Sequence, residues 1–178
     1  VDFSGALLTS ADLTRVTANK DTILKRANFD SATLSTASML GSDFTGASLN
    51  GANLSGAKLA GSNFTQANMR GAILSGASLD DVIMTSAVLT SANLEGANSK
   101  QNLNLSDANL VDAILKSASL LGTNFTNASM VRADLSGSFL GTSDFTGANL
   151  SDAVLAGASA NPTMKMIQAN LVNAKMML

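Results

Sequence analysis

Small, polar and large apolar residues recur along this chain with a period of five. Residues 52–66 show the unit three times, as ANLSG, AKLAG and SNFTQ. The small and the large residue are two positions apart, so on an extended backbone both point to one side. The polar residue between them points to the other side. The pattern therefore predicts short extended segments, each with one apolar side.

The last two residues of each unit must turn the chain. Five is an odd number, so a continuous strand would turn each successive unit over. Glycine is frequent at these positions, as at Gly46, Gly56 and Gly71, and it suits a corner. A period of five does not keep one face of a 3.6-residue helix apolar, which excludes helices. We expect an all-β chain of short strands joined by corners.

A second period shows how many units complete one coil. Phenylalanine is rare, yet Phe44 and Phe64 are 20 residues apart, and so are Phe125 and Phe145. Four units per coil would stack these rings in one column of the core. The pattern predicts a four-sided β-helix of nearly nine coils. It covers residues 1–178 as a single solenoid domain.

Three extra residues interrupt the period, near 19–21, 100–102 and 161–163. Each follows a unit with a small central residue, and all three units fall on the same side of the predicted coil. We therefore expect Lys20, Gln101 and Pro162 to project from one corner, in line along the solenoid.

The unit resembles the repeat of the pentapeptide repeat family, which reads Ala-(Asp/Asn)-Leu-X-X. The matching segments are Ala11-Asp12-Leu13, Ala52-Asn53-Leu54, Ala92-Asn93-Leu94, Ala108-Asn109-Leu110, Ala133-Asp134-Leu135 and Ala148-Asn149-Leu150. The resemblance extends over the whole chain. It implies a right-handed quadrilateral β-helix, and handedness comes from the resemblance alone.

Composition narrows the range of functions. The net charge is −2, so no basic field favours nucleic acid. The chain has no His, Cys, Tyr or Trp, the residues from which most general bases, nucleophiles and metal ligands come. No apolar run is long enough for a membrane span, although peripheral contact with a membrane stays open. We expect no enzyme activity, no catalytic residue, no metal and no cofactor.

Acidic residues offer the only candidates for chemistry. Asp80 and Asp81 are adjacent, and Asp2, Asp43 and Asp144 share one outward column. Carboxylates can hold divalent cations or act as acid and base. A solvated corner and the Asp or Asn of the family repeat explain both sets more simply, so we assign neither a function.

Apolar residues at outward positions are candidate contacts with a partner. Val111 and Val131 should stack in one column, and Ile114 and Val154 should lie round the adjoining corner. Phe139 also points outward. Because a contiguous apolar patch marks an interface, these residues are candidate interaction sites.

The C-terminal coil is a second candidate. The last coil of a solenoid exposes core and unpaired strand edge, and Met adapts to irregular surfaces. We expect another protein chain, or end-to-end self-association, to cover it. The residues concerned are Met164, Met166, Met176, Met177 and Leu178.

These observations favour a structural scaffold that docks onto a larger protein assembly. Lumenal members of the family suggest a photosynthetic setting in the thylakoid, and the start at Val1 suggests a processed chain; bacterial cytoplasm or periplasm are the other compartments. Two alternatives remain. Some family members protect DNA gyrase by imitating DNA, but they are strongly acidic. A Ser/Thr column from Ser4 to Thr146 could order water, as in ice-binding solenoids.

Overall fold

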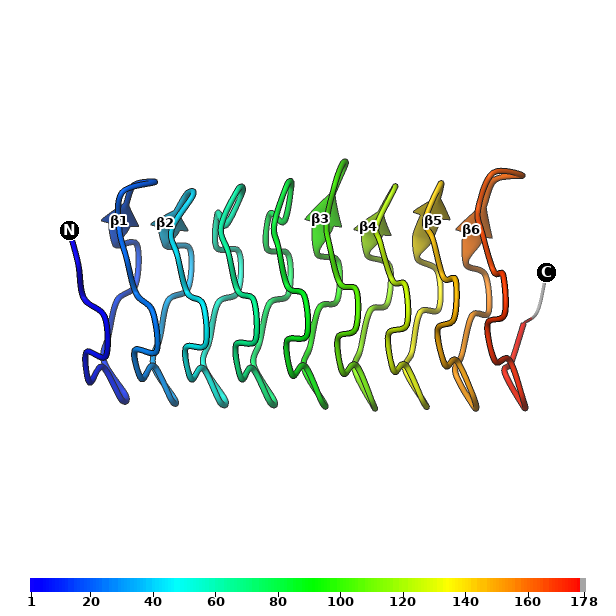
Figure 1. The fold of residues 1–178 in the computed structure, drawn as a ribbon, viewed down its shortest axis with the longest axis horizontal. Helices are drawn as coiled ribbons and strands as arrows, with labels where there is room; N and C mark the ends of the chain where they lie inside the picture. Colours follow the sequence, from blue (N-terminus) through cyan, green and yellow to red (C-terminus); the bar gives the residue numbers. More distant parts are fainter. Residues whose placement is uncertain (177–178) are drawn as a thin grey trace.

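The computed structural model describes residues 1–176 as a stack of short strands and turns. In Figure 1 the coils follow one another along the long axis, with the two termini at opposite ends. Six strands are long enough to name. They are β1 (Thr17–Ala18), β2 (Ser38–Met39), β3 (Asn98–Ser99), β4 (Ser119–Leu120), β5 (Phe139–Gly141) and β6 (Ser159–Ala160). They form parallel sheets in the orders β1-β2 and β3-β4-β5-β6. Among residues 1–176 no helix has the length and apolar character to cross a bilayer.

Parallel bridges connect each coil to the next in four series. We name each series after its first residue: the Asp2, Leu7, Asp12 and Thr17 ladders. The Asp2 ladder, for example, continues through Ile23, Asp43 and Asn63. Successive bridge partners are 20 or 21 residues apart, as for Asp43–Asn63 and Asp2–Ile23. The chain is thus a β-helix in which bridged residues point outward and their neighbours point inward.

The longer bridge intervals lie where the sequence places the extra residues. The sequence interval between bridge partners increases from 20 to 21 residues at three places along the Asp2 ladder. These are Asp2–Ile23, Ile83–Asn104 and Asp144–Lys165. The three insertions therefore all follow the Thr17 ladder, after β1, β3 and β6. Lys20 leans onto the next coil, since a Cβ on Gly41 would lie 2.8 Å from the Lys20 Cβ.

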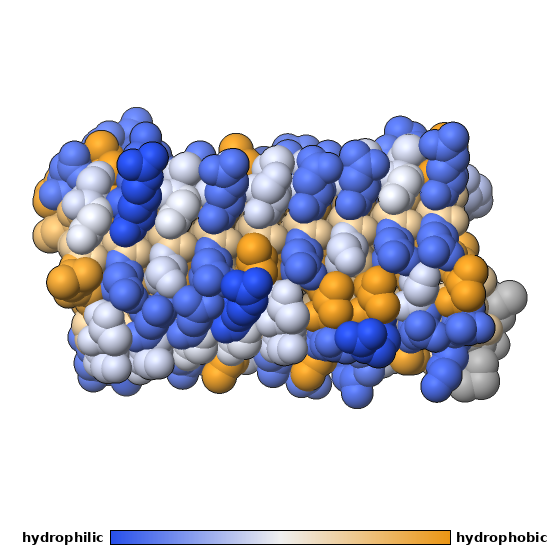
Figure 2. Space-filling view, turned by 60° about the horizontal axis from the view of Figure 1, so that its bottom comes forward, coloured by the Kyte–Doolittle hydropathy of each residue, from blue (hydrophilic) through white to orange (hydrophobic). Residues whose placement is uncertain are grey.

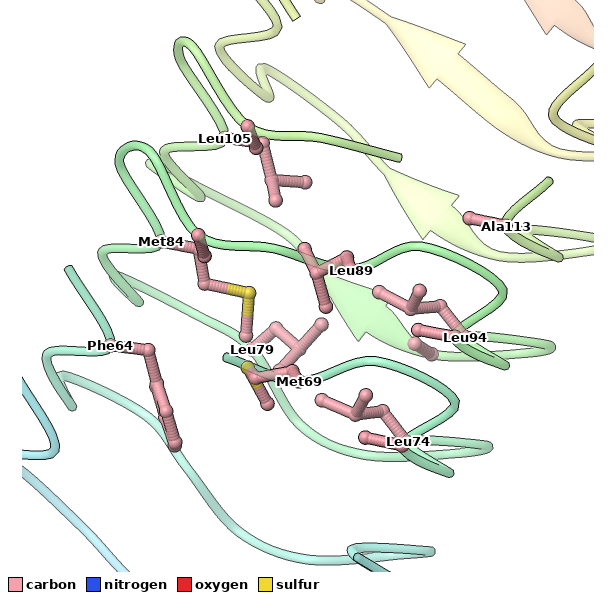
Figure 3. Close-up of a cluster of buried hydrophobic side chains, with 14 of the residues drawn as sticks. Phe64, Met69, Leu74, Leu79, Met84, Leu89, Leu94, Leu105 and Ala113 are labelled. Carbon is pink, nitrogen blue, oxygen red and sulfur yellow. The ribbon is translucent and has the colours of Figure 1, made fainter. Parts of the chain in front are cut away.

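The core contains the small and large residues of every unit. From Leu24 to Leu155 the central residues are almost fully buried, as are the alanines two positions earlier. Figure 3 shows that central side chains of successive coils, such as Phe64 and Met84, point into one interior. The Phe44 and Phe64 rings stack at 4.5 Å between centroids with an angle of 6°. Such aromatic pairs contribute roughly 0.5–1.5 kcal/mol beyond burial.

The last residue of each unit turns the corner in the left-handed region of the backbone. Gly56 has φ 63° and needs no side chain there, but Arg15 at 58° and Asp107 at 57° adopt the same conformation. Left-handed backbone costs a non-glycine residue about 1 kcal/mol. The corner therefore favours glycine without requiring it.

Buried hydroxyl groups on the inner side of the Asp2 ladder bond to the backbone of earlier coils. Ser62 Oγ donates to the Met39 carbonyl and Ser143 Oγ to the Leu120 carbonyl, both at 2.6 Å. Thr123 is equally buried, yet its Oγ1 has no partner among the described residues.

Candidate interaction surfaces

The outward Asp and Asn residues stabilise the corners. At most corners, as at Thr45 and Thr65, the N–H of the residue that follows the central residue has no backbone acceptor among residues 1–176. Asn63 supplies one: its Oδ1 accepts the Thr65 N–H at 2.9 Å and the Thr65 Oγ1–H at 2.6 Å. Asp43 does the same for Thr45. The Asp or Asn of the repeat is thus an Asx-turn cap with a structural role.

The same bonds occupy the Ser/Thr column that begins at Ser4. The hydroxyls of Ser4, Thr45 and Thr126 each donate at 2.6 Å to the carboxylate or amide two residues earlier. These hydroxyls have no proton left for water and meet it only as acceptors. The geometry therefore argues against a water-ordering surface.

Aliphatic residues replace the cap at several outward positions. Ile73, Ile114 and Val154 alternate with Asn93 and Asp134 along the Asp12 ladder. As a result, the N–H that lies two residues after each aliphatic side chain has no acceptor among residues 1–176. Lys116, two residues after Ile114, and Ala156, two residues after Val154, are examples.

At each such position the chain gives up a hydrogen bond and exposes apolar surface. Ile83, on the Asp2 ladder, is 40% exposed and Ile114 is 37% exposed. The N–H of Thr85, two residues after Ile83, also lacks an acceptor among the described residues. An aliphatic side chain therefore does not serve the corner as Asn or Asp does.

The four predicted lateral residues occupy two neighbouring columns and do not form one continuous patch. Val111 and Val131 lie on successive coils, as the Asp112 N–H donates to the Val131 carbonyl at 3.0 Å, and both are half-buried. Ile114 and Val154 are not adjacent, because Asp134 lies between them on the Asp12 ladder. Figure 2 shows, on the face that it presents, hydrophobic groups scattered among polar ones, with no large continuous hydrophobic area. We call Val111, Ile114, Val131 and Val154 the lateral surface.

An ion pair divides the lateral surface. Arg132 donates to both carboxylate oxygens of Asp112, from Nε at 2.6 Å and from an Nη at 2.7 Å. The bond from Arg132 holds the pKa of Asp112 below its usual value. Asp112 lies between Val111 and Ile114 in the chain, so aliphatic groups flank an arginine fork. Arginine is enriched in protein interfaces.

Phe139 lies apart from the lateral surface, on the Thr17 ladder. It is 54% exposed at the start of β5, where the strand register is irregular. Leu121, on the preceding coil, occupies the space that a Cβ on Gly141 would need. Phe139, in β5, and Leu121, directly after β4, are thus both exposed on adjacent coils.

The predicted methionines of the C-terminal coil are only in part exposed. Met164 and Met166 are half-buried and Met176 is exposed, whereas Met177 and Leu178 lie outside the described residues. Met164, Met166 and Met176 help to line a hollow of about 150 Å³. At the other end, Phe3 and Leu8 help to line an apolar hollow of about 340 Å³. Both ends of the described stack therefore expose core.

Asp81, one of the adjacent acidic pair, is held at its corner by hydrogen bonds. The side chains of Gln101 and Asn102 donate to Asp81 at 3.0 and 2.9 Å, and these bonds, Asn102 first, lower its pKa. A general acid at neutral pH needs a raised pKa instead. Within residues 1–176 no three His, Cys, Asp or Glu side chains come together as a metal site.

Several exposed apolar residues were missed in the sequence. Leu7 is 84% exposed, and Ile83, Ile167 and Val172 are also exposed. Leu7 and Ile83 occupy the polar middle position of the unit, so an aliphatic residue there was the sign that could have identified them.

The comparisons with known proteins agree with this architecture. The profile of pentapeptide repeats matches residues 20–51, 47–85, 74–98 and 104–141. HetL from the cyanobacterium Nostoc sp. strain PCC 7120, a pentapeptide repeat protein involved in heterocyst differentiation regulation, is 29% identical. Its TM-score is 0.61, over 98% of this chain and 82% of HetL. A search of curated proteins finds no match.

A trypsin-treated form of QnrB1, a plasmid-mediated fluoroquinolone resistance protein, has a TM-score of 0.74 over 99% of this chain and 90% of QnrB1. At 18% identity this likeness shows the fold only. A pentapeptide repeat protein from the Arabidopsis thaliana thylakoid lumen is 29% identical over 67% of this chain and 69% of that protein. Its TM-score of 0.39 is too low to relate the compartments of the two proteins.

The structural likeness to HetL and QnrB1 implies a right-handed β-helix, as the resemblance predicts. The matched segments span more than half of the sequence. This chain belongs to the pentapeptide repeat family.

Proposed function

We propose that this chain is a non-enzymatic scaffold that docks onto a larger protein assembly through its lateral surface. In this proposal the chain is one four-sided solenoid of nearly nine coils over residues 1–178. Its regular coils set outward side chains at the spacing of neighbouring strands, about 4.8 Å. A rigid surface of this kind loses little conformational freedom when it binds.

The aliphatic residues at uncapped corners carry the proposal. At Ile114 and Val154 an Asn or Asp would accept a hydrogen bond from the chain itself, as Asn63 does. The aliphatic side chain forgoes that bond and remains partly in water. Ile83 shares this feature, but Ile114 and Val154 have the aliphatic Val111 and Val131 round the adjoining corner, so together they offer a partner more than one aliphatic contact.

Imitation of DNA is the weaker candidate. A DNA mimic needs a continuous acidic stripe. On the Asp2 ladder, by contrast, Ile23 separates Asp2 from Asp43, and Lys165 follows Asp144. Ion pairs from Lys25 to Asp43 and from Lys165 to Asp144 neutralise the carboxylates further.

The compartment remains a prediction. The family resemblance favours the thylakoid lumen and a photosynthetic assembly over bacterial cytoplasm or periplasm. Fractionation of the source cells, with detection of the tagged chain in the lumenal fraction, tests this. Recovery of the chain from another compartment only would contradict the lumenal setting and leave the docking proposal standing.

The double variant Ile114→Asn with Val154→Asn tests the docking proposal. Each Asn offers the corner the cap that the parent lacks, so the fold should not be weakened. We expect the tagged parent to migrate in a large band on native gels of extracts from its source. The double variant should migrate as the free chain, because it has lost two aliphatic contacts.

Ile83→Asn is the matched control. It makes the same chemical change at a similarly exposed residue on the Asp2 ladder, away from the lateral surface. This variant should stay in the large band. A parent that migrates only as the free chain, or a double variant that stays in the large band, would contradict docking through the lateral surface.

A further inference from the structure

Aliphatic and polar residues alternate from coil to coil along part of the Asp12 ladder. Successive parallel bridges lead from Ile73 to Asn93, Ile114, Asp134 and Val154. Ile73 and Ile114 are 38% and 37% exposed and Val154 is half-buried. The aliphatic side chains therefore form a straight row with one member on every second coil. We call Ile73, Ile114 and Val154 the aliphatic row.

Each member of the aliphatic row lies beside a corner that lacks a cap. The N–H two residues after each member has no acceptor among residues 1–176, as at Ser75. The polar residues between them cap their own corners: the Asn93 Oδ1, for example, accepts the Glu95 N–H at 2.9 Å. The aliphatic members therefore stabilise no corner of their own chain, and their side chains remain available to a partner.

The step of the aliphatic row selects the secondary structure of a partner that runs along it. Neighbouring strands are about 4.8 Å apart, so members of the row two coils apart are separated by about 9.6 Å. On an α-helix, residues seven positions apart lie on the same side and are separated by about 10.5 Å. On an extended strand, residues of one face recur at about 6.6 Å and about 13 Å. A helix therefore fits each step to within about 1 Å, whereas a strand misses it by about 3 Å or more.

The charges beside the aliphatic row that have no ion pair are mostly acidic. Glu95 and Asp152 are exposed and form no ion pair among residues 1–176. Lys116 and Arg132 are already paired with aspartates of neighbouring coils. Arg70, at the Ile73 end of the row, donates from Nη1 to a side-chain amide at 3.3 Å. A partner with lysine or arginine beside its apolar side would therefore complement the two free carboxylates.

We propose that the partner docks as an amphipathic α-helix that lies along the aliphatic row, parallel to the long axis of the stack. This inference rests on the docking function proposed above and names the element that docks. Apolar residues of the helix, seven positions apart, contact Ile73, Ile114 and Val154, and its lysine or arginine side chains face Glu95 and Asp152. The row spans four coils, about 19 Å, which a helix of ordinary length covers with about 13 residues.

Photo-crosslinking from two positions of the stack tests the helix. The photoreactive amino acid p-benzoylphenylalanine replaces Ser75 in one variant and Ala156 in another, four coils apart beside the aliphatic row. In a control variant it replaces Thr85, beside the Asp2 ladder. Each variant is expressed in the source cells and irradiated, and mass spectrometry locates the cross-linked residue of the partner. The sites reached from positions 75 and 156 should lie about 13 residues apart in one segment, because a helix rises about 1.5 Å per residue. The control should not reach that segment.

The spacing of the cross-linked sites separates this inference from the docking function. Sites about six residues apart would indicate an extended segment, because a strand rises about 3.3 Å per residue, and would overturn the helix while docking stands. Sites in unrelated segments of the partner would overturn it as well. No cross-link from either position, in variants that keep the circular dichroism spectrum of the parent, would contradict docking itself. So would an equal yield from the control position.

A neutral double variant, Glu95→Gln with Asp152→Asn, tests the charges of the helix. Loss of two exposed pairs should lower the yield of cross-linking from position 156 about two- to tenfold in low salt. Added salt should narrow the difference from the parent by screening these charges. Asp107→Asn, an equally exposed change at another corner, is the control and should leave the yield unchanged. Equal yields from the neutral variant and the parent would contradict lysine or arginine beside the apolar side of the helix.

Discussion

Replacement of a single capping residue tests the role assigned to the outward Asp and Asn. Asn63 is half-buried in the middle of the Asp2 ladder, and its Oδ1 accepts two hydrogen bonds from Thr65. In Asn63→Ala the Thr65 N–H loses its only acceptor. The Thr65 hydroxyl can turn to water, because that residue is itself only half-buried.

The expected loss follows from these two bonds. A net hydrogen bond contributes about 0.5–1.5 kcal/mol, and loss of a comparable helix cap costs about 1 kcal/mol. The hydroxyl recovers part of its bond from water, so the free energy of unfolding should fall by about 1–2 kcal/mol. Asn63→Asp keeps the acceptor and should change stability by less than about 0.5 kcal/mol.

Urea unfolding followed by far-ultraviolet circular dichroism measures this difference, since the chain has no Trp or Tyr to report by fluorescence. The midpoint should fall for Asn63→Ala with an unchanged slope, which indicates a change in stability alone. If Asn63→Ala and the parent unfold at the same urea concentration, the capping account is wrong.

Three further outcomes follow from the structure. Leu54→Asp places an unpaired charge where the parent side chain is fully buried, so it should lower the free energy of unfolding by about 3 kcal/mol or more; a melting temperature equal to the parent's would refute the inward assignment. Thr123→Val should be neutral or stabilising by up to about 1 kcal/mol, whereas Ser62→Ala should cost about 1 kcal/mol, because only Ser62 has a partner; urea midpoints that shift equally would contradict this. The lowered pKa of Asp112 and of other aspartates means that the folded form binds protons less readily than the unfolded chain. Their contribution should therefore be present above about pH 4 and lost as the pH falls below it, while the urea midpoint stays level from about pH 6 to 8, since the chain has no His.

The fold could be predicted because the five-residue unit specifies each strand and corner, and the 20-residue period specifies which residues stack. The spacing of Phe44 and Phe64 in the sequence placed them in one column, and their rings stack. The extra residues lie at corners after the Thr17 ladder, where the chain bulges without moving the inward residues out of register.

The candidate surfaces could be predicted only in part. Val111 and Val131 lie on successive coils as expected. The same 20-residue period places Asp134 between Ile114 and Val154, a separation that was missed although the sequence contains it. The capping role of Asn63 was also hidden, because the repeat shows only that a polar residue is preferred there. Which N–H groups lack an acceptor depends on the corner geometry of the whole stack, and a single unit does not contain it.

Amide hydrogen exchange tests the central claim most directly, by following the uncapped N–H groups of the lateral surface. Lys116 and Ala156 lie two residues after Ile114 and Val154, and their N–H groups have no acceptor among residues 1–176. In the isolated chain these amides should exchange fast, and in the native assembly they should be protected. Thr85 follows Ile83 away from that surface and should exchange fast in both states. Fast exchange of Lys116 and Ala156 in the assembly, or equal slowing of Thr85, would contradict docking through the lateral surface.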